Sequence, residues 1–141
     1  MLLLHTADLH LGVESYGRVD PQTGLSTRFA DFLAVFDQAV DCALEREAAL
    51  FLFCGDAYKS RSHNPTQQRE FARRVERLAR GGVAVFLLAG NHDLPHAPAL
   101  AHSVEIFDTL GVARVCVASR PDTYRVETRA GPLQIIALPW V

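Results

Sequence analysis

The chain has 141 residues, of which 49% are hydrophobic and 21% are charged, and its formal net charge is −2 at pH 7. This composition is typical of one folded domain with a sizeable core and excludes a disordered chain. The slightly acidic balance means that any contact with nucleic acid must come from a local group of basic residues.

Segments that read as strands and helices alternate along the chain. The expected elements, in chain order, are a strand at residues 2–5, a loop at 13–24, a helix at 27–47 after Ser26 as N-cap, a strand at 49–54, a helix from Pro65 to residue 80 after Asn64 as N-cap, a strand at 83–89, a helix at 98–110, and strands at 112–117, 123–127 and 133–138. Residues 129–132 are typical of a hairpin turn. This order predicts an α/β sheet that is covered on both faces.

Cysteine usage and the N-terminus bear on the cellular compartment. The three cysteines, Cys42, Cys54 and Cys116, are odd in number and include no Cys-x-x-Cys pair, which favours buried free thiols over a disulfide framework or a zinc ribbon. The N-terminal apolar run is too short for a signal peptide or a membrane span. We therefore expect a cytoplasmic protein with no membrane contact.

Three of the expected strands end in short clusters of Asp, Asn, His and Gly. The clusters are Asp8-Leu9-His10, Gly55-Asp56 and Asn91-His92-Asp93. If the strands are parallel, all three clusters lie at one edge of the sheet, where open α/β sheets bind ligands. Carboxylate, amide and imidazole groups without thiolate favour Mn²⁺, Fe²⁺ or Mg²⁺, with Zn²⁺ also suitable.

The first two clusters suggest metal ligands. Asp8 and His10 are two residues apart, so in an extended segment both side chains can face one cation. Asp56 follows Gly55, which permits a sharp turn, and its carboxylate can bridge two cations. The alternative for Asp56, taken alone, is a carboxylate that caps a turn.

The third cluster suggests both a ligand and a catalytic group. Asn91 offers an amide oxygen to a metal, while His92 can contact the substrate or the leaving group. Asp93 can hold the His92 imidazole in one tautomer and orientation. A plain polar turn is the alternative, although a turn does not require this composition.

These residues carry a resemblance to a known family. The three clusters, with Gly90 before Asn91, resemble the first three motifs of the calcineurin-like metallophosphoesterases. Residues 5–12 (HTADLHLG) and 138–140 (LPW) further resemble SbcD-type DNA nucleases, over essentially the whole chain. The resemblance implies a β-sandwich flanked by helices with a two-metal site at the strand ends, and residues 1–141 would form the N-terminal part of the nuclease domain.

The resemblance also implies roles for individual residues. By the family pattern, Asp8 and His10 bind the first cation, Asp56 bridges, Asn91 binds the second cation, and His92, supported by Asp93, assists at the phosphate. It implies a metal-dependent DNA nuclease in double-strand-break and DNA-end processing, with two divalent cations, Mn²⁺ foremost. The implied partners are DNA, an SbcC-type ABC ATPase and a second copy of the chain.

The chain departs from the family pattern in one respect. The late Gly-His-x-His of the family does not occur, and His96 and His102 follow Asn91 too soon to replace it. We therefore expect an incomplete sandwich without its C-terminal strands and little or no nuclease activity in this chain alone. Two alternatives are a phosphatase or small-nucleotide phosphodiesterase of the same superfamily, and a non-catalytic scaffold that binds DNA or a partner.

Basic and apolar surface residues suggest contacts with partners. Lys59 and Arg61 follow the bridging Asp56 and could contact a phosphate backbone, with solvated loop charges as the alternative. The helix expected at 98–110 carries apolar residues on more than one side, among them Ile106 and Leu110. One core cannot easily bury both sides, so this helix predicts an apolar strip for a homodimer contact.

Overall fold

The computed structural model describes residues 1–95, 97 and 100–140 of the chain. Its elements, in chain order, are β1 (Leu3–Thr6), α1 (Thr27–Glu45), β2 (Leu50–Phe53), α2 (Pro65–Arg80), β3 (Ala84–Leu88), α3 (Glu105–Thr109), β4 (Val115–Ala118), β5 (Asp122–Thr128) and β6 (Gly131–Ala137). In the described part of the chain, no helix has the length and apolar character needed to cross a membrane.

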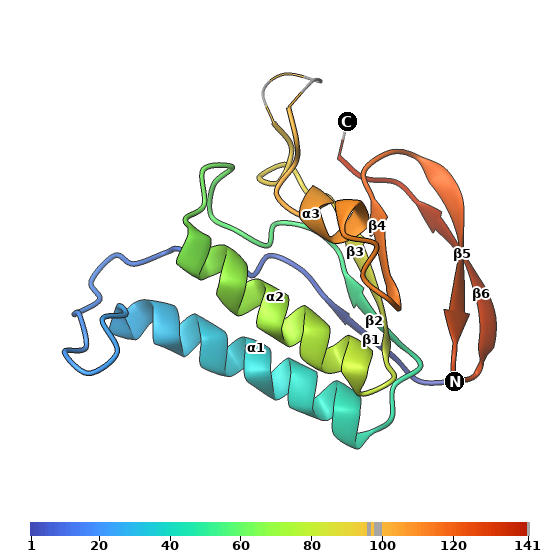
Figure 1. Cartoon of the computed structure of the whole chain (residues 1–141), viewed down its shortest axis with the longest axis horizontal. Helices are drawn as coiled ribbons and strands as arrows, with labels where there is room; N and C mark the ends of the chain where they lie inside the picture. The colour runs from blue at the N-terminus through green and yellow to red at the C-terminus, as the bar shows by residue number, and fades with distance from the viewer. Residues whose placement is uncertain (96, 98–99, 141) are drawn as a thin grey trace.

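Strands β1 to β4 form one sheet in the order β1-β2-β3-β4, and every neighbouring pair is parallel. The register aligns Leu50 of β2 with both Leu3 of β1 and Ala84 of β3. Because the strands are parallel, the segments that follow β1, β2 and β3 all leave the same edge of the sheet, at the upper ends of the strands in Figure 1. This edge is where the sequence predicts the three polar clusters.

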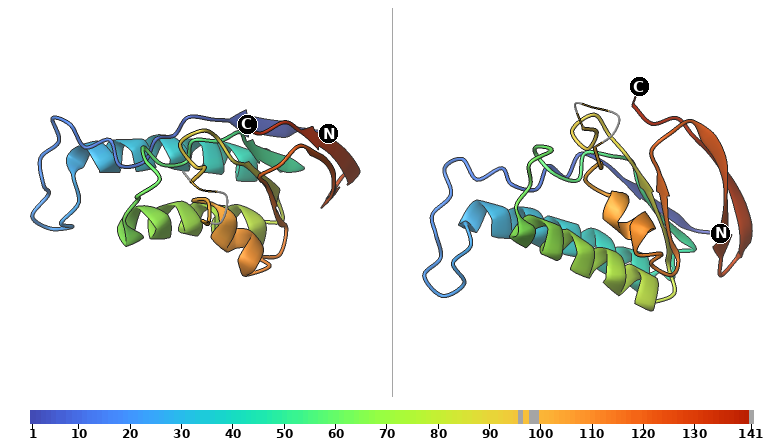
Figure 2. Two further views of the ribbon diagram at one scale, coloured as in Figure 1. Left: turned by 90° about the horizontal axis from the view of Figure 1, so that it is seen from above. Right: turned by 45° about the horizontal axis from the view of Figure 1, so that its top comes forward.

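The sheet is covered differently on its two faces. Alternate strand residues such as Phe51, Phe53 and Val85 pack against α1 and α2, which lie side by side over one face (Figure 1). Their neighbours Leu50 and Phe86 belong to a second core with the antiparallel hairpin β5–β6 on the other face (Figures 1 and 2). This helix–sheet–hairpin arrangement confirms the expected fold class.

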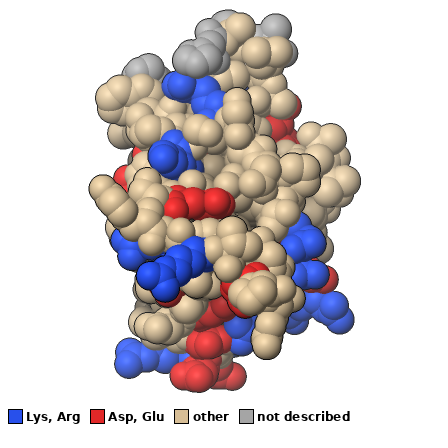
Figure 3. Space-filling view, turned by 90° about the vertical axis from the view of Figure 1, so that its left-hand side faces the viewer, with Lys and Arg blue, Asp and Glu red and all other residues tan. Residues whose placement is uncertain are grey.

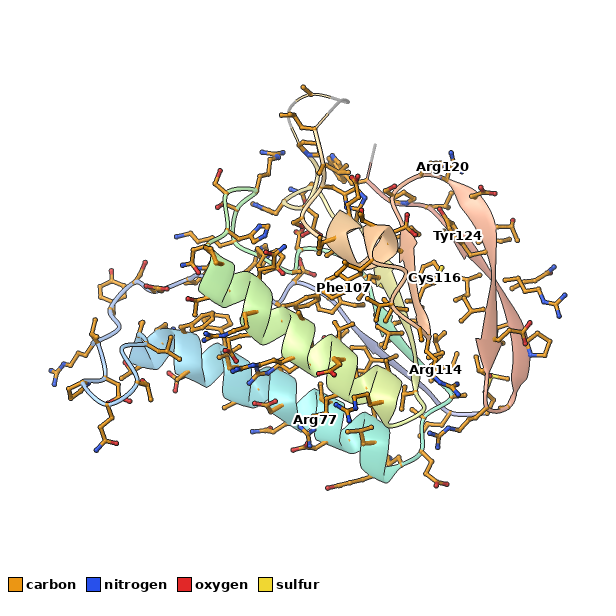
Figure 4. All side chains as sticks on the ribbon, in the orientation of Figure 1. Arg77, Phe107, Arg114, Cys116, Arg120 and Tyr124 are labelled. Atoms are coloured by element: carbon orange, nitrogen blue, oxygen red, sulfur yellow. The ribbon has the colours of Figure 1, made fainter. Side chains whose placement is uncertain are left out.

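Aromatic contacts fix the two outer layers on the sheet. Phe71 of α2 stacks on Phe36 of α1 with 5.6 Å between ring centroids, and both rings contact Phe53 of the sheet. On the other face, the ring of Tyr124, labelled in Figure 4, meets that of Phe86 edge-on at 5.4 Å. Burying each of these phenylalanine rings stabilises the fold by roughly 1.5–3 kcal/mol relative to leaving it exposed.

The helix boundaries follow local chemistry. At the start of α2, Asn64 Oδ1 accepts from Gln67 N at 2.9 Å and Gln67 Oε1 accepts from Asn64 N at 3.0 Å, a reciprocal capping box with Pro65 at the first helical position. Ser26 is the N-cap residue of α1, as expected, but its hydroxyl makes no capping hydrogen bond. The sequence therefore predicts both starts correctly and overstates the role of the serine side chain.

Helix α3 is much shorter than the helix that the sequence predicts. Residues 98 and 99 of the expected helix lie outside the described part of the chain, and the helical segment begins only at Glu105. Ser103 explains the late start, because its N–H and hydroxyl donate to the main-chain and side-chain oxygens of Asp93. This tertiary contact holds residue 103 in a turn, so the expectation of a helix was wrong at residues 100–104.

The expected hairpin is present, with a tighter turn. Strands β5 and β6 pair from Asp122↔Ala137 to Thr128↔Gly131, which leaves Arg129 and Ala130 as the two turn residues. Gly131 has a φ of 103°, a conformation that favours glycine, and it opens β6. The expected turn at 129–132 is therefore confirmed in place and shortened by two residues.

Candidate metal centre

Three loops leave the common edge of the parallel sheet. We name them L1 (residues 7–12, after β1), L2 (residues 54–63, after β2) and L3 (residues 89–95, after β3). L1 and L2 run side by side, since Asp8 N donates to Gly55 O at 3.1 Å and His10 N donates to Asp56 O at 3.0 Å. The main-chain ladder of the sheet thus continues beyond the strands and fixes the positions from which the polar side chains project.

The backbone of the candidate ligands is unusual. Asp8, His10 and Asp56 have φ values of 57°, 47° and 59°. Non-glycine residues rarely adopt this left-handed region, and each costs about 1–3 kcal/mol that the surrounding structure must offset. Three such residues in adjacent loops are typical of a functional site that holds its side chains in fixed directions.

Two glycines let L2 and L3 approach closely. A Cβ on Gly55 would lie 2.7 Å from Gly90 Cα, and a Cβ on Gly90 would lie 2.3 Å from Asp56 Oδ1. Neither contact is sterically possible, so a side chain at either position would push L2 away from L3. The glycines therefore determine where the Asp56 carboxylate stands.

The side chains of His10, Asp56 and His92 converge at this edge. Each offers one possible ligand atom, and these atoms all lie within 4.8 Å of one another. Nε2 of His10 is 3.8 Å from Asp56 Oδ2, and the two imidazole rings are 5.0 Å apart in an edge-on arrangement. Two imidazoles and a carboxylate form a donor set that suits a divalent transition metal, so the residues fit the metal that the sequence predicts.

The Asp56 carboxylate is held by both neighbouring loops. It is buried, and its Oδ1 accepts from the main-chain N–H of His92 at 2.9 Å. Its Oδ2 faces His10. One oxygen is therefore anchored to L3 while the other is directed toward the histidine of L1, an orientation compatible with the expected bridging role.

Asp8 and Asn91 lie at the margin of this group. Asp8 Oδ1 is 3.5 Å from His10 Nε2, and 70% of the Asp8 side chain is exposed to solvent. Asn91 is also exposed and directly precedes His92 in L3. The structure thus brings Asp8 next to the convergent donors, and the ligand roles of Asp8 and Asn91 stay predictions.

Asp93 lies between L2 and L3 and binds both loops. It is 1% exposed, and its Oδ2 accepts from Asp56 N at 2.7 Å and from Gly90 N at 2.9 Å. Its Oδ1 accepts from Ala57 N at 3.3 Å and from the Ser103 hydroxyl at 2.6 Å. These four bonds account for the acceptor capacity of a carboxylate and tie L2 to L3. Asp93 is therefore a positioning residue for these loops, and its expected role toward the His92 ring stays a prediction.

The two basic residues of L2 differ from each other. Arg61 donates from Nη2 to Asn91 O at 3.1 Å and from Nε to Leu94 O. Its guanidinium thus binds the main chain of L3, a role that sequence reasoning, which considered only phosphate contact or solvated charge, did not foresee. Lys59 is exposed, and its main-chain N–H donates to Leu11 O at 2.9 Å.

Sequence reasoning also missed Ser103, and it did not count His102 as a metal ligand. Ser103 is buried and completes the hydrogen bonds of Asp93, ten residues earlier in the chain, and no local pattern signals this contact. His63 and His102 do not belong to the convergent donors around Asp56. His96 lies outside the described residues.

A family comparison agrees with this geometry. The family described as calcineurin-like phosphoesterase matches residues 1–132. The chain therefore belongs to the calcineurin-like phosphoesterases, a family of metal-dependent hydrolases. The resemblance seen in the sequence motifs is confirmed at the level of the family.

The chain is also similar in sequence to several individual proteins. Over 77% of its length the chain is 29% identical to the DNA double-strand break repair protein Mre11 of Thermoplasma acidophilum, and over 86% it is 26% identical to the protein of that name from Sulfurisphaera tokodaii. It is also 27% identical, over 66% of its length, to the uncharacterized metallophosphoesterase YhaO of Bacillus subtilis. The chain spans 27%, 29% and 23% of these three relatives, respectively.

Proposed function

We propose that this chain is the N-terminal part of a metal-dependent DNA phosphodiesterase of the SbcD type, acting on DNA ends. The observation that carries the proposal is the convergence of His10, Asp56 and His92 at one edge of a parallel sheet. Relatives that carry the name of a DNA double-strand break repair protein, at 25–29% identity, support DNA as the substrate class.

The proposed site holds two divalent cations, with Mn²⁺ as the first candidate. When bound, such cations stabilise negative charge on phosphoryl oxygens and lower the pKa of water. Asp8 and His10 would bind the first cation and Asn91 the second, with Asp56 shared between them. The short distances from His10 Nε2 to Asp8 and Asp56 support this division.

His92 would act on the substrate in this proposal. Its main-chain N–H is fixed by Asp56, and its ring lies edge-on to that of His10. An imidazole held there can donate a proton or a hydrogen bond to the departing oxygen of a phosphodiester. Asp93 and Arg61 would contribute indirectly, by holding L3, and thus His92, in place.

The charged and apolar side chains on the surface bear on the proposed DNA and protein partners. Acidic and basic side chains are interspersed over the face seen in Figure 3, without a continuous basic patch. DNA contact would therefore depend on single exposed residues such as Lys59. A groove between α2 and α3 is lined by apolar side chains, including those of Ala72, Val75, Ile106 and Leu110. This groove supports a homodimer contact. An SbcC-type ABC ATPase partner and a cytoplasmic location complete the proposal.

Hydrolysis assays test the proposed substrate. The chain, and a form extended through any downstream histidines, are assayed in millimolar Mn²⁺ on duplex DNA ends and on a small chromogenic phosphodiester. We expect DNA cleavage by the extended form, its loss in Asp56→Asn, and little or no cleavage by the 141 residues alone, since their second cation would have only Asp56 and Asn91 as protein ligands. The exposed Asp31→Asn serves as the matched control.

Three other results of these assays would replace or correct the proposal. Hydrolysis of the small ester without cleavage of DNA would replace the proposal with a phosphatase or small-nucleotide phosphodiesterase. An extended form that binds no Mn²⁺ would replace it with a non-catalytic scaffold. Full activity of the 141-residue chain would show that the ligand assignment is incomplete.

A further inference from the structure

The first turn of α2 lies against the end of L1 (Figure 1). Gly12, the last residue of L1, has a φ of 105°. A Cβ on Gly12 would lie 2.6 Å from Nε2 and 3.0 Å from Cδ of Gln67, and, apart from its two chain neighbours, the three nearest heavy atoms all belong to this side chain. The Gln67 carboxamide therefore occupies the space in which a side chain at residue 12 would stand.

The side chain of Gln67 is itself fixed by the capping box of α2. Its Oε1 accepts from Asn64 N at 3.0 Å, while its main-chain N–H donates to Asn64 Oδ1 at 2.9 Å. Only 9% of Gln67 is exposed, although glutamine lies mostly on the surface of proteins. Because capping alone does not require burial, the burial of Gln67 reflects its contact with L1. One end of the carboxamide is thus bound to the start of α2 and the other is directed at L1.

This contact supports the turn that carries His10. Val13 N donates to His10 O at 3.4 Å, so residues 10–13 form one turn, and Gly12 is its third residue. His10 has a φ of 47°, which a residue other than glycine rarely adopts without support from its surroundings. Main-chain hydrogen bonds to L2 hold the turn on one side, and Gln67 closes it on the other.

We propose that Gln67 is a positioning residue of the candidate metal centre, which holds L1 so that His10 Nε2 faces Asp56 Oδ2. The inference rests on the proposed function only in so far as His10 binds a cation, and it does not depend on the substrate. Without the carboxamide, the turn has open space on its α2 side, so His10 is free to leave its left-handed conformation and the donors separate.

The size of the effect follows from how Gln67 acts. Removing a group that orients a metal ligand by a direct hydrogen bond typically weakens metal binding by about 10–100-fold. Gln67 acts through the main chain of Gly12 rather than through a bond to the His10 imidazole. We therefore expect a loss of about tenfold, at the lower end of this range.

Calorimetry of Mn²⁺ binding to the whole chain tests this role. Gln67→Ala should weaken binding at the first cation site by about tenfold. Asn64→Ala is the matched control, because it removes the other hydrogen bond of the same capping box and should lower the unfolding temperature similarly. It keeps the main-chain N–H that binds Gln67 Oε1, so its Mn²⁺ affinity should equal that of the parent protein. Gln67→Glu keeps both the acceptor and the bulk against Gly12 and should bind Mn²⁺ at least as tightly as the parent protein.

Co²⁺ provides a second measurement, because its visible absorption spectrum depends on the number and arrangement of its ligands. At saturating Co²⁺, Gln67→Ala should have an altered spectrum, whereas Asn64→Ala and Gln67→Glu should match the parent protein. If Gln67→Ala does not fold, Gln67→Asn, whose carboxamide is one methylene shorter, takes its place.

The possible results separate this inference from the proposed function. If Gln67→Ala binds Mn²⁺ as tightly as Asn64→Ala and its Co²⁺ spectrum is that of the parent protein, the positioning role is overturned while the metal centre stands. A parent protein that binds neither cation would overturn the metal centre and the positioning role together. The expected loss in Gln67→Ala, found in a protein that does not cleave DNA, would support the positioning role and contradict only the nuclease proposal.

Discussion

Replacing Asp93 with asparagine should destabilise the whole domain rather than merely slow catalysis. In Asp93→Asn, the amide group would stand where one carboxylate oxygen now accepts two hydrogen bonds, either from Asp56 N and Gly90 N or from Ala57 N and the Ser103 hydroxyl. Hydrogen bonds to a charged group contribute about 1.5–3 kcal/mol each. The two groups that now donate to that oxygen would also be left, in a buried site, against the NH₂ group of the asparagine. We therefore expect a loss of roughly 3–5 kcal/mol in the free energy of unfolding.

This loss can be measured by urea unfolding followed by circular dichroism. For 141 residues, an unfolding entropy of about 2.1 cal/mol/K per residue converts the loss into a fall of about 10–17 °C in the unfolding temperature. Ser103→Ala removes one of the four bonds and should cost about 1–2 kcal/mol. The exposed Asp31→Asn should stay within about 0.5 kcal/mol of the parent protein.

The opposite result would support the role that the sequence alone predicts. If Asp93 served mainly to orient the His92 imidazole, Asp93→Asn would unfold like the parent protein and lose only hydrolytic rate. A change of less than about 1 kcal/mol together with a large loss of rate would therefore refute the positioning role.

Three further predictions concern the metal centre and the groove. Asp56→Asn should weaken both cation sites in calorimetry, because the carboxylate is expected to serve both; loss at one site only would contradict bridging. His92→Ala should keep the metals and lower the hydrolysis rate of an active, extended form by about 10²–10⁴-fold, and a parallel collapse of metal occupancy would show that His92 is a ligand. Leu110→Glu, at a side chain 68% exposed beside the α2–α3 groove, should convert a dimer to a monomer in light scattering, whereas Val35→Glu, 63% exposed on α1, should not. A parent protein that is already monomeric at micromolar concentration would count against the groove as a dimer contact.

The sheet and the place of the site could be predicted from the sequence because both depend on local patterns. Apolar runs of strand length mark β1, β2 and β3, and the polar cluster after each run must lie at the common edge once the strands are parallel. The helix caps at Ser26 and Asn64 are also local signals. These features need no knowledge of contacts between distant residues.

The hydrogen bonds within the site could not be predicted in this way. Asp93 binds Asp56 N across 37 residues, and nothing near Asp93 in the sequence distinguishes this arrangement from a carboxylate directed at His92. Ser103 likewise reads as a residue inside a helix until its contact with Asp93 is known. The left-handed backbone at Asp8 and His10 has no sequence signal either, because neither position is glycine.

The spacing of the site loops along the chain has a consequence for synthesis on the ribosome. Asp8 and His10 are made first, but their main-chain partners Gly55 and Asp56 follow more than forty residues later. The N–H and the carboxylate of Asp56 in turn lack their hydrogen bonds until L3 has emerged. The nascent chain therefore cannot assemble the three donors before most of the parallel sheet has paired, and contacts of such long range are slow to form. Binding of a cation at the edge that carries His10 and Asp56 should thus report that this half of the domain has completed folding.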